Sequence, residues 1–217
     1  MSKDRWATFD CYGTLIDWNG GIRAELERLF GDDEDEIANL LGRYHAIEPE
    51  LERSGTLTYR EVMTEAMRQL GAPEGEEGGL ADSLPTWEPF PEVHDALVEA
   101  RERGWRLAIL SNSDPDLIAA SKELIGMPFD ETVVASEIHS YKPAVMHFLE
   151  FQARTLVDRN RHVHVAASIY HDVVPANTLR IPSIWINRLD EHPATSPARV
   201  LPDLTELPDT LDELRPA

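Results

Sequence analysis

Short runs of apolar residues alternate along this chain with longer stretches in which apolar side chains recur every three or four positions. The short runs predict strands at residues 6–9, 105–110, 132–135, 162–166 and 183–186, with a shorter one near Val200. The longer stretches between most strands predict amphipathic helices, for example at residues 93–103, 116–124 and 144–155. Because alternating strands and helices are typical of βαβ units, we expect an α/β fold with a Rossmann-like, doubly wound parallel sheet.

The first two predicted strands are separated by a segment that is too long for an ordinary crossover connection. Most of this segment has a helical pattern, which predicts helices at residues 21–30, 34–48, 59–70 and 80–84. Prolines mark the return to the sheet, at Pro85, Pro89 and Pro91. We therefore expect an α-helical cap domain inserted after the first strand, at residues 18–87, over a core formed by residues 1–17 and 88–217.

The overall charge excludes some partners. The 217 residues carry a formal net charge of −20, and we expect no nucleic-acid partner because phosphate backbones require clustered lysine and arginine. No apolar run is long enough to span a membrane, and the N-terminus lacks the apolar stretch of a signal peptide. The single cysteine, Cys11, excludes an internal disulfide and fits a reducing compartment. We expect a cytoplasmic protein with no membrane partner.

The first predicted strand ends in a carboxylate, Asp10, which a Gly-Thr turn follows closely. Ligands bind at the carboxyl ends of strands in open parallel sheets, so a carboxylate at this edge is well placed as a nucleophile. The alternative is an aspartate that only ends a strand or caps a helix. Three further segments bear on this choice.

Each of these segments places polar side chains near another strand end. Ser111 and Asn112 end the second strand and could donate hydrogen bonds to an anion beside Asp10, or could cap the next helix. Lys142 precedes a proline and could keep a nearby carboxylate ionised, or could be an ordinary solvated lysine. Asp172 follows the fourth strand closely and could complete a charge network with Lys142, or lie in a surface loop.

Three histidines near the fourth strand suggest a further alternative. His162 and His164 share one face of that strand, and His171 follows it. Such a group could bind a metal, but ligand thiolates are missing and only Asp172 is close in sequence. We expect no metal site and no cofactor.

The four segments around Asp10, Ser111, Lys142 and Asp172, in this order, resemble the haloacid dehalogenase superfamily of hydrolases. The resemblance spans nearly the whole core, and the ordered combination is more specific than any single segment. It implies that Asp10 is the nucleophile and forms a covalent intermediate. It also implies that Ser111 provides the hydroxyl of the second motif, Lys142 the lysine of the third and Asp172 the acid of the fourth.

The residues around these motifs look like those of the L-2-haloacid dehalogenase (type II) branch. Phosphatases of the superfamily carry a second aspartate where this chain has Tyr12, and usually a Gly-Asp pair where it has Ala166 and Ala167. Both missing carboxylates would help to hold Mg²⁺ and to protonate a leaving alkoxide. A halide leaves as a stable anion and needs no proton, so metal-free attack on carbon suits this site better.

The resemblance also implies roles in binding a small anionic substrate. In the cap, Arg43 would draw off the halide. Ser111, Asn112 and backbone N–H groups near Cys11 and Tyr12 would hold the substrate carboxylate. Thr14 and Ser168 complete the predicted substrate-binding set, and Lys142 and Asp172 would polarise the hydrolytic water.

Three positions depart from the branch, which usually has tyrosine, serine and asparagine where this chain has Phe148, Ala167 and Ile169. We therefore expect a metal-independent 2-haloacid dehalogenase with an altered substrate or weak activity. The alternatives are a Mg²⁺-dependent small-molecule phosphatase and a non-catalytic member of the superfamily. The resemblance is also compatible with a homodimer.

Overall fold

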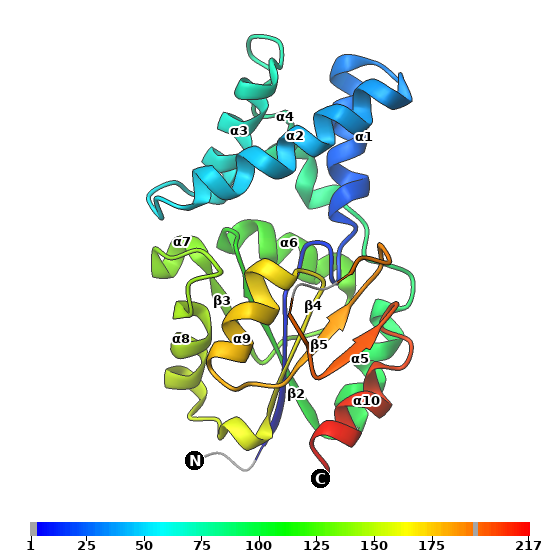
Figure 1. The fold of residues 1–217 in the computed structure, drawn as a ribbon, viewed down its shortest axis with the longest axis vertical. Coiled ribbons are helices and arrows are strands. Elements are labelled where there is room, and N and C mark those ends of the chain that lie inside the picture. The colour runs from blue at the N-terminus through cyan, green and yellow to red at the C-terminus, as the bar shows by residue number, and fades with distance from the viewer. Residues whose placement is uncertain (1–3, 193–194) are drawn as a thin grey trace.

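The computed structural model describes residues 4–192 and 195–217, which contain one six-stranded sheet in the order β3-β2-β1-β4-β5-β6. Every neighbouring pair of strands is parallel (Figure 1). The strands are β1 (Arg5–Phe9), β2 (Trp105–Ser111), β3 (Glu131–Val134), β4 (His162–Ala166), β5 (Ser183–Ile186) and β6 (Arg199–Leu201). The predicted Rossmann-like sheet is confirmed.

The sheet separates two hydrophobic layers, because successive side chains of a strand point to opposite faces. The helices that follow the cap are α5 (Val93–Glu102), α6 (Pro115–Ile125), α7 (Ala135–Ile138), α8 (Met146–Thr155), α9 (Val174–Thr178) and α10 (Leu207–Leu214). Phe9 and Ile109 belong to one layer, together with residues of α5, α6 and α10. Leu110 belongs to the other layer, together with residues of α8 and α9. The sheet is therefore covered on both faces, as a doubly wound fold requires.

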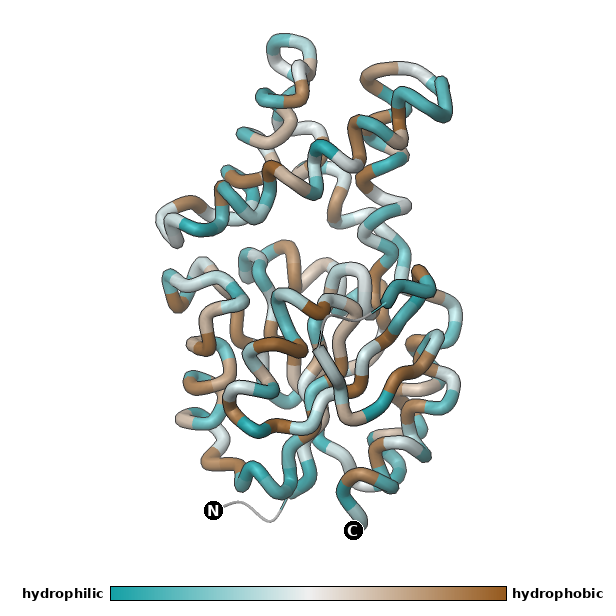
Figure 2. Tube along the Cα trace, in the orientation of Figure 1, coloured by the Kyte–Doolittle hydropathy of each residue, from teal (hydrophilic) through white to brown (hydrophobic). Residues whose placement is uncertain are grey.

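A group of helices lies beyond the carboxyl ends of the strands (Figure 1). It consists of α1 (Trp18–Phe30), α2 (Glu34–Glu52), α3 (Tyr59–Leu70), α4 (Gly79–Ser83) and the short 3₁₀ helix η1 (Leu84–Thr86). Hydrophobic and hydrophilic positions alternate along these helices (Figure 2), which lets each bury one face against its neighbours. We call these helices the cap; the domain boundaries at residues 18 and 87 stay a prediction.

Local side-chain chemistry explains where the cap helices begin. Asp17 accepts a hydrogen bond from the backbone of Gly20, so α1 starts earlier than its apolar pattern predicts. Thr58 and Glu61 form a capping box at the start of α3. Helix α2 continues beyond the predicted end at residue 48 and reaches Glu52.

Other boundaries were also imprecise. Helix α8 begins at Met146, two residues after the predicted start, and the sequence pattern missed α10. Two short helices flank β4, the 3₁₀ helix η2 (Arg159–Arg161) and the π-helix η3 (Ile169–Val173). Among all helices of residues 4–192 and 195–217, none has the length and apolar character to cross a membrane.

Candidate active site

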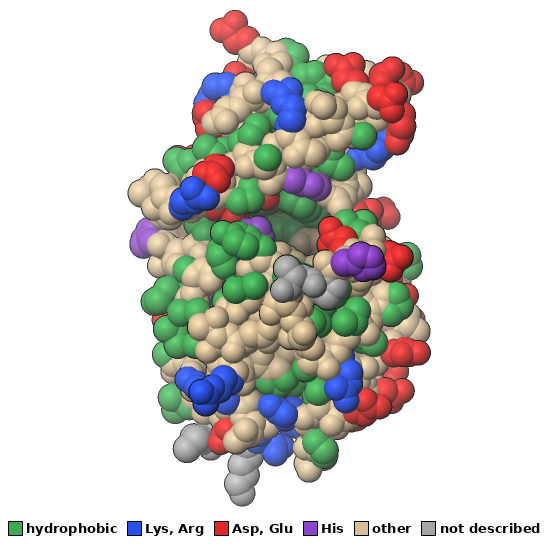
Figure 3. Space-filling model, in the orientation of Figure 1, with side chains coloured by type: hydrophobic (Ala, Val, Ile, Leu, Met, Phe, Trp, Pro, Cys, Tyr) green, Lys and Arg blue, Asp and Glu red, His purple; other side chains and the backbone are tan. Residues whose placement is uncertain are grey.

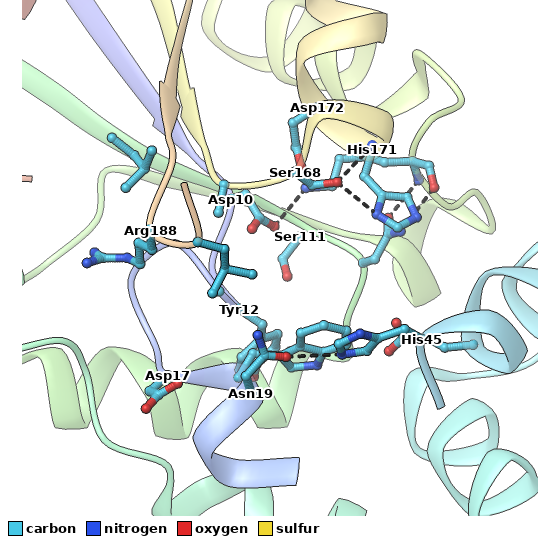
Figure 4. A pocket seen from close by; sticks show the side chains of 18 of the residues that line it. Asp10, Tyr12, Asp17, Asn19, His45, Ser111, Ser168, His171, Asp172 and Arg188 are labelled. Atoms are coloured by element: carbon cyan, nitrogen blue, oxygen red, sulfur yellow. Dashed lines mark hydrogen bonds and ion pairs between the residues drawn. The ribbon is translucent and has the colours of Figure 1, made fainter. Parts of the chain in front are cut away.

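The carboxyl ends of the central strands meet beneath the cap, where a cavity of about 500 Å³ opens. The molecular surface is hollowed between the cap helices and the sheet (Figure 3). Asp10 follows β1, Ser111 ends β2 and Ser168 follows β4 closely, and all three line the cavity. Figure 4 shows these side chains grouped on one side, with Asn19 and His45 of the cap across from them. The sequence-predicted strand ends are therefore brought together in one site.

Lys142 joins the two predicted catalytic carboxylates. Its Nζ donates hydrogen bonds to Asp10 Oδ1 at 2.8 Å, to Asp172 Oδ1 at 2.6 Å and to the carbonyl oxygen of Leu110 at 2.8 Å. An ammonium group has three N–H donors, so these acceptors satisfy all of them. Lys142 is only 2% exposed, and the three bonds replace the water that it loses on burial.

These charges shift one another's proton affinity. Burial raises the pKa of Asp10, and the positive charge of Lys142 opposes that rise. Burial also disfavours the charged forms of Lys142 and Asp172, but their mutual attraction outweighs it. The pKa of Lys142 is therefore raised and that of Asp172 lowered, which keeps both charged at neutral pH.

The network continues behind Asp172 into the core. Asp172 Oδ1 also pairs with His164 Nε2 at 3.0 Å. Thr8 Oγ1 lies 2.9 Å from His164 Nδ1 and 2.8 Å from His162 Nε2. The two histidines on one face of β4 therefore bond to a shared threonine hydroxyl.

Thr14 fixes the orientation of the predicted nucleophile. Its Oγ1 donates to Asp10 Oδ2 at 2.9 Å and accepts from the backbone N–H of Ala167 at 2.8 Å. Thr14 is fully buried and does not line the cavity, so its predicted place in the substrate-binding set is corrected to a positioning role. The Cys11 side chain is also fully buried, in the hydrophobic core, which leaves only its backbone for substrate binding.

Helix α2 brings two carboxyl groups to the cavity. Glu48 Oε1 accepts hydrogen bonds from the hydroxyls of Tyr59 at 2.7 Å and Tyr44 at 3.3 Å. Glu52 Oε2 accepts one from Asn112 Nδ2 at 3.1 Å, across the gap between cap and sheet. Burial raises the pKa of Glu48 to about 7 and the pKa of Glu52 well above its ordinary value.

Aromatic rings complete the cap side of the cavity. Tyr12 stacks on Tyr59 with ring centroids 6.1 Å apart, and Trp18 stacks on His45 at 4.8 Å. The indole N–H of Trp18 donates to the hydroxyl of Tyr59 at 3.2 Å. His45 Nε2 lies 3.0 Å from Asn19 Oδ1, the contact marked by a dashed line in Figure 4. The cap side of the cavity thus combines aromatic rings with the two carboxyl groups of α2, across from the polar strand ends.

A comparison with known proteins decides the family. The model for haloacid dehalogenase-like hydrolases matches residues 5–165. The chain belongs to this family. Its first, second and third motifs fall within the matched region, and Asp172 of the fourth lies just beyond it. The predicted superfamily and the prediction of a hydrolase are confirmed.

Individual relatives of this hydrolase are 2-haloacid dehalogenases. It is 28% identical over 203 residues to the (S)-2-haloacid dehalogenase of Pseudomonas sp. strain YL, covering 87% of this chain and 84% of the relative. It is also 28% identical over 203 residues to haloacetate dehalogenase H-2 of Moraxella sp. strain B, covering 87% and 88%. A crystal structure of an L-2-haloacid dehalogenase superposes with a TM-score of 0.85 at 25% identity, covering 97% of this chain and 100% of that one.

Arg43 is the predicted site residue that the structure places elsewhere. Its side chain is exposed, its Nη2 donates to the backbone oxygen of Gln69 at 3.3 Å, and it does not line the cavity. Arg43 and Glu48 are five positions apart, about 140° around a helix at about 100° per residue, so both cannot face the same cavity. The expectation that Arg43 binds the halide is therefore corrected. His45, Glu48 and Glu52 occupy the face of α2 that lines the cavity.

The sequence-based analysis of this hydrolase also missed residues that line the cavity, above all Glu52 and the role of His171. Glu52 is four positions after Glu48, a spacing that places both on one helix face. Their burial could have been suspected because Leu40 and Tyr44 continue the same face toward the core. Asn112 and Ser168 line the cavity as predicted, although Asn112 also holds the backbone of Lys142 in place.

Proposed function

We propose that the protein hydrolyses small 2-haloalkanoic acids, with Asp10 forming a covalent ester to the substrate carbon. The observation that carries this proposal is a carboxylate at the floor of the cavity, oriented by Thr14 and Lys142. The named activities of the similar (S)-2-haloacid and haloacetate dehalogenases point to the same substrate class. Nucleophilic catalysis of this kind divides one difficult substitution into two easier steps.

In the first step, an Asp10 carboxylate oxygen attacks the carbon that bears the halogen. A carbon–oxygen bond forms, the carbon–halogen bond breaks, and the halide leaves with the bonding electron pair. Ser111 and the backbone N–H groups near Cys11 and Tyr12 hold the substrate carboxylate close to the nucleophile. The departing halide faces Asn19 and other cap residues rather than a guanidinium of the cap.

In the second step, water adds to Cγ of the Asp10 ester. The bond between Cγ and the substrate-linked oxygen then breaks, which releases a 2-hydroxy acid and restores the carboxylate. Lys142 lies against Asp10 and stabilises the negative charge that develops on the carbonyl oxygen. Asp172 keeps Lys142 charged and in place throughout.

The donor set supports a mechanism without a divalent metal. Mg²⁺ requires near-octahedral coordination by oxygen ligands. Within residues 4–192 and 195–217, no group of three or more His, Cys, Asp or Glu side chains is arranged to hold a metal ion. Both oxygens of Asp10 accept bonds from Thr14 and Lys142, and Ala167 occupies the position where superfamily phosphatases usually supply a carboxylate. These residues do not fit Mg²⁺, and the two steps of the proposed reaction use no metal ion.

The test is halide release from both enantiomers of 2-chloropropionate and from fluoroacetate, in excess EDTA. We expect EDTA-resistant release by the wild-type protein and none by Asp10→Asn. A parallel panel of phosphate esters with Mg²⁺ examines the phosphatase alternative. Mg²⁺-dependent phosphate release, or no activity in either panel, would refute the proposal.

A further inference from the structure

His171 points a ring nitrogen toward the cavity. It lies in the π-helix η3, a wide helical turn of a kind often found at functional sites. Ser168 begins this helix, and its hydroxyl accepts a hydrogen bond from the backbone N–H of His171 at 3.1 Å. The same hydroxyl lies 3.2 Å from His171 Nδ1, so it also fixes the ring (Figure 4). Two contacts to one serine therefore define how the imidazole is presented.

The other ring nitrogen, Nε2, is available for chemistry. It is buried and has no hydrogen-bond partner among the described residues. When Nδ1 carries the ring proton and donates a hydrogen bond to Ser168 Oγ, Nε2 has an unshared lone pair. Glu52 Oε2 of the cap lies 3.7 Å from Nε2, too far for a direct hydrogen bond.

His171 is a better proton acceptor in this cavity than Asp172. Asp172 Oδ1 is already shared between Lys142 and His164, and these contacts lower the pKa of its carboxyl group. A carboxylate whose charge is so well matched has little affinity for a further proton. Burial lowers the pKa of His171 to about 4, so its imidazole is neutral at pH 7 and its unprotonated ring nitrogen can accept a proton.

We propose that His171 is the general base for the second step, removing a proton from the water that hydrolyses the Asp10 ester. This inference rests on the proposed function. Ser168 orients the ring. The Ser168–His171 contact supplies a base in a chain that has Ile169 and Ala167 where its branch usually has asparagine and serine.

The protons of the step balance with one water and no other reactant. His171 Nε2 takes one proton from water, and the resulting hydroxide oxygen bonds to Cγ of Asp10. When the Cγ–oxygen bond to the substrate breaks, the product alkoxide takes the second proton of that water, which restores the Asp10 carboxylate. The imidazolium then releases its proton to solvent and returns to its neutral form.

His171 lies between two cavities. A second cavity of about 310 Å³ lies beside the first, and Glu52, Lys142 and His171 line both. His171 thus stands at the boundary between the substrate cavity and a second space.

The test separates the two chemical steps in His171→Asn and His171→Gln. Mixed with 2-chloropropionate, each variant should release one halide per active site at the wild-type rate. Steady-state turnover should then fall by about 100-fold or more, the usual contribution of a general base. Intact-protein mass spectrometry should detect the propionate ester accumulating on residue 10. His94→Gln is the matched control, because His94 is exposed and lines neither cavity, and it should turn over like wild type.

Ser168→Ala is a second variant that keeps the base. The ring of His171 is less well oriented in this variant, so ester hydrolysis should slow by about tenfold. Full turnover by both His171 variants, or loss of their halide burst, would overturn the assignment. Ester accumulation in Asp172→Asn but not in the His171 variants would make Asp172 the base instead. Absence of halide release from the wild-type protein would remove the proposed function itself, before any variant is compared.

Discussion

Lys142→Met should strongly destabilise the protein as well as stop catalysis. The substitution removes the ammonium group and leaves the carboxylates of Asp10 and Asp172 buried together without a counter-charge. Lys142 Nζ lies 2.8 Å from one and 2.6 Å from the other, and each contact is worth about 6 kcal/mol at an effective dielectric constant of about 20. Desolvation of the charges offsets most of this attraction, and loss of one partner from such a buried cluster costs about 3–5 kcal/mol.

That loss is a large share of the total free energy of unfolding, which is about 5–15 kcal/mol for a single domain. Urea denaturation followed by tryptophan fluorescence should show a midpoint lowered by about 2 M at pH 8, for a typical slope of about 2 kcal/mol per molar. Lys122→Met is the matched control. Lys122 is only half-buried and donates to the hydroxyl of Thr132, so its loss should cost about 0.5 kcal/mol.

The effect should also depend on pH in a defined direction. Without Lys142, the two buried carboxylates acquire raised pKa values in the folded state, above the value of about 3.9 in the unfolded chain. A raised pKa in the folded state contributes stability at low pH that is lost as the pH rises. The stability gap between wild type and Lys142→Met should therefore be smaller at pH 5 than at pH 8. An equal gap at both pH values, or a variant as stable as Lys122→Met, would refute this reasoning.

Further variants examine other parts of the site. Thr14→Val removes the hydroxyl that orients Asp10, and halide release should fall by about 10- to 100-fold, since an unsatisfied buried group costs about 1–3 kcal/mol; a rate within twofold of wild type would contradict this. Burial raises the pKa of Glu48 to about 7, so its contribution to stability is lost as the pH rises from its unfolded value of 4.5 through 7. Glu48→Gln should therefore lose about 2 kcal/mol less free energy of unfolding than wild type between pH 5.5 and pH 8.5 in urea unfolding, and identical pH profiles would count against the buried carboxyl. Arg43→Ala should retain halide release within about twofold, because its guanidinium is exposed and lies outside the cavity; a loss of tenfold or more would return Arg43 to the active site.

The fold was predictable because its sheet is buried on both faces. All residues of β4 and all residues of β2 except Arg106 are buried, and the sequence pattern located both strands to within one residue at each end. The central site was predictable for the same reason, because parallel strands bring their carboxyl ends to one edge. Asp10 and Ser111 each stand at such an end, and Lys142 and Asp172 were placed by motif order.

The cap side of the site was harder to predict. A carboxylate on a helix normally faces water, and this chain has 40 acidic residues, so the helix face that Glu52 shares with Tyr44 and Glu48 is only a weak indication of its burial. Its environment depends on how α2 packs over the carboxyl ends of the strands, which is decided by tertiary structure. The rotation of α2 about its own axis also determines that Arg43 faces away from the cavity. The sequence shows a histidine next to Asp172, but it does not predict the π-helix that turns the ring of His171 toward the cavity.

The central claim is that Asp10 bonds covalently to a substrate carbon and that water then attacks the aspartyl carbonyl. The direct measurement is one turnover of excess enzyme with 2-chloropropionate in ¹⁸O-water, followed by mass spectrometry of the peptide that contains residue 10 and of the lactate released. We expect ¹⁸O in the Asp10 carboxyl group and unlabelled oxygen in the new hydroxyl of lactate. Label in the lactate hydroxyl, with none in the peptide, would contradict it.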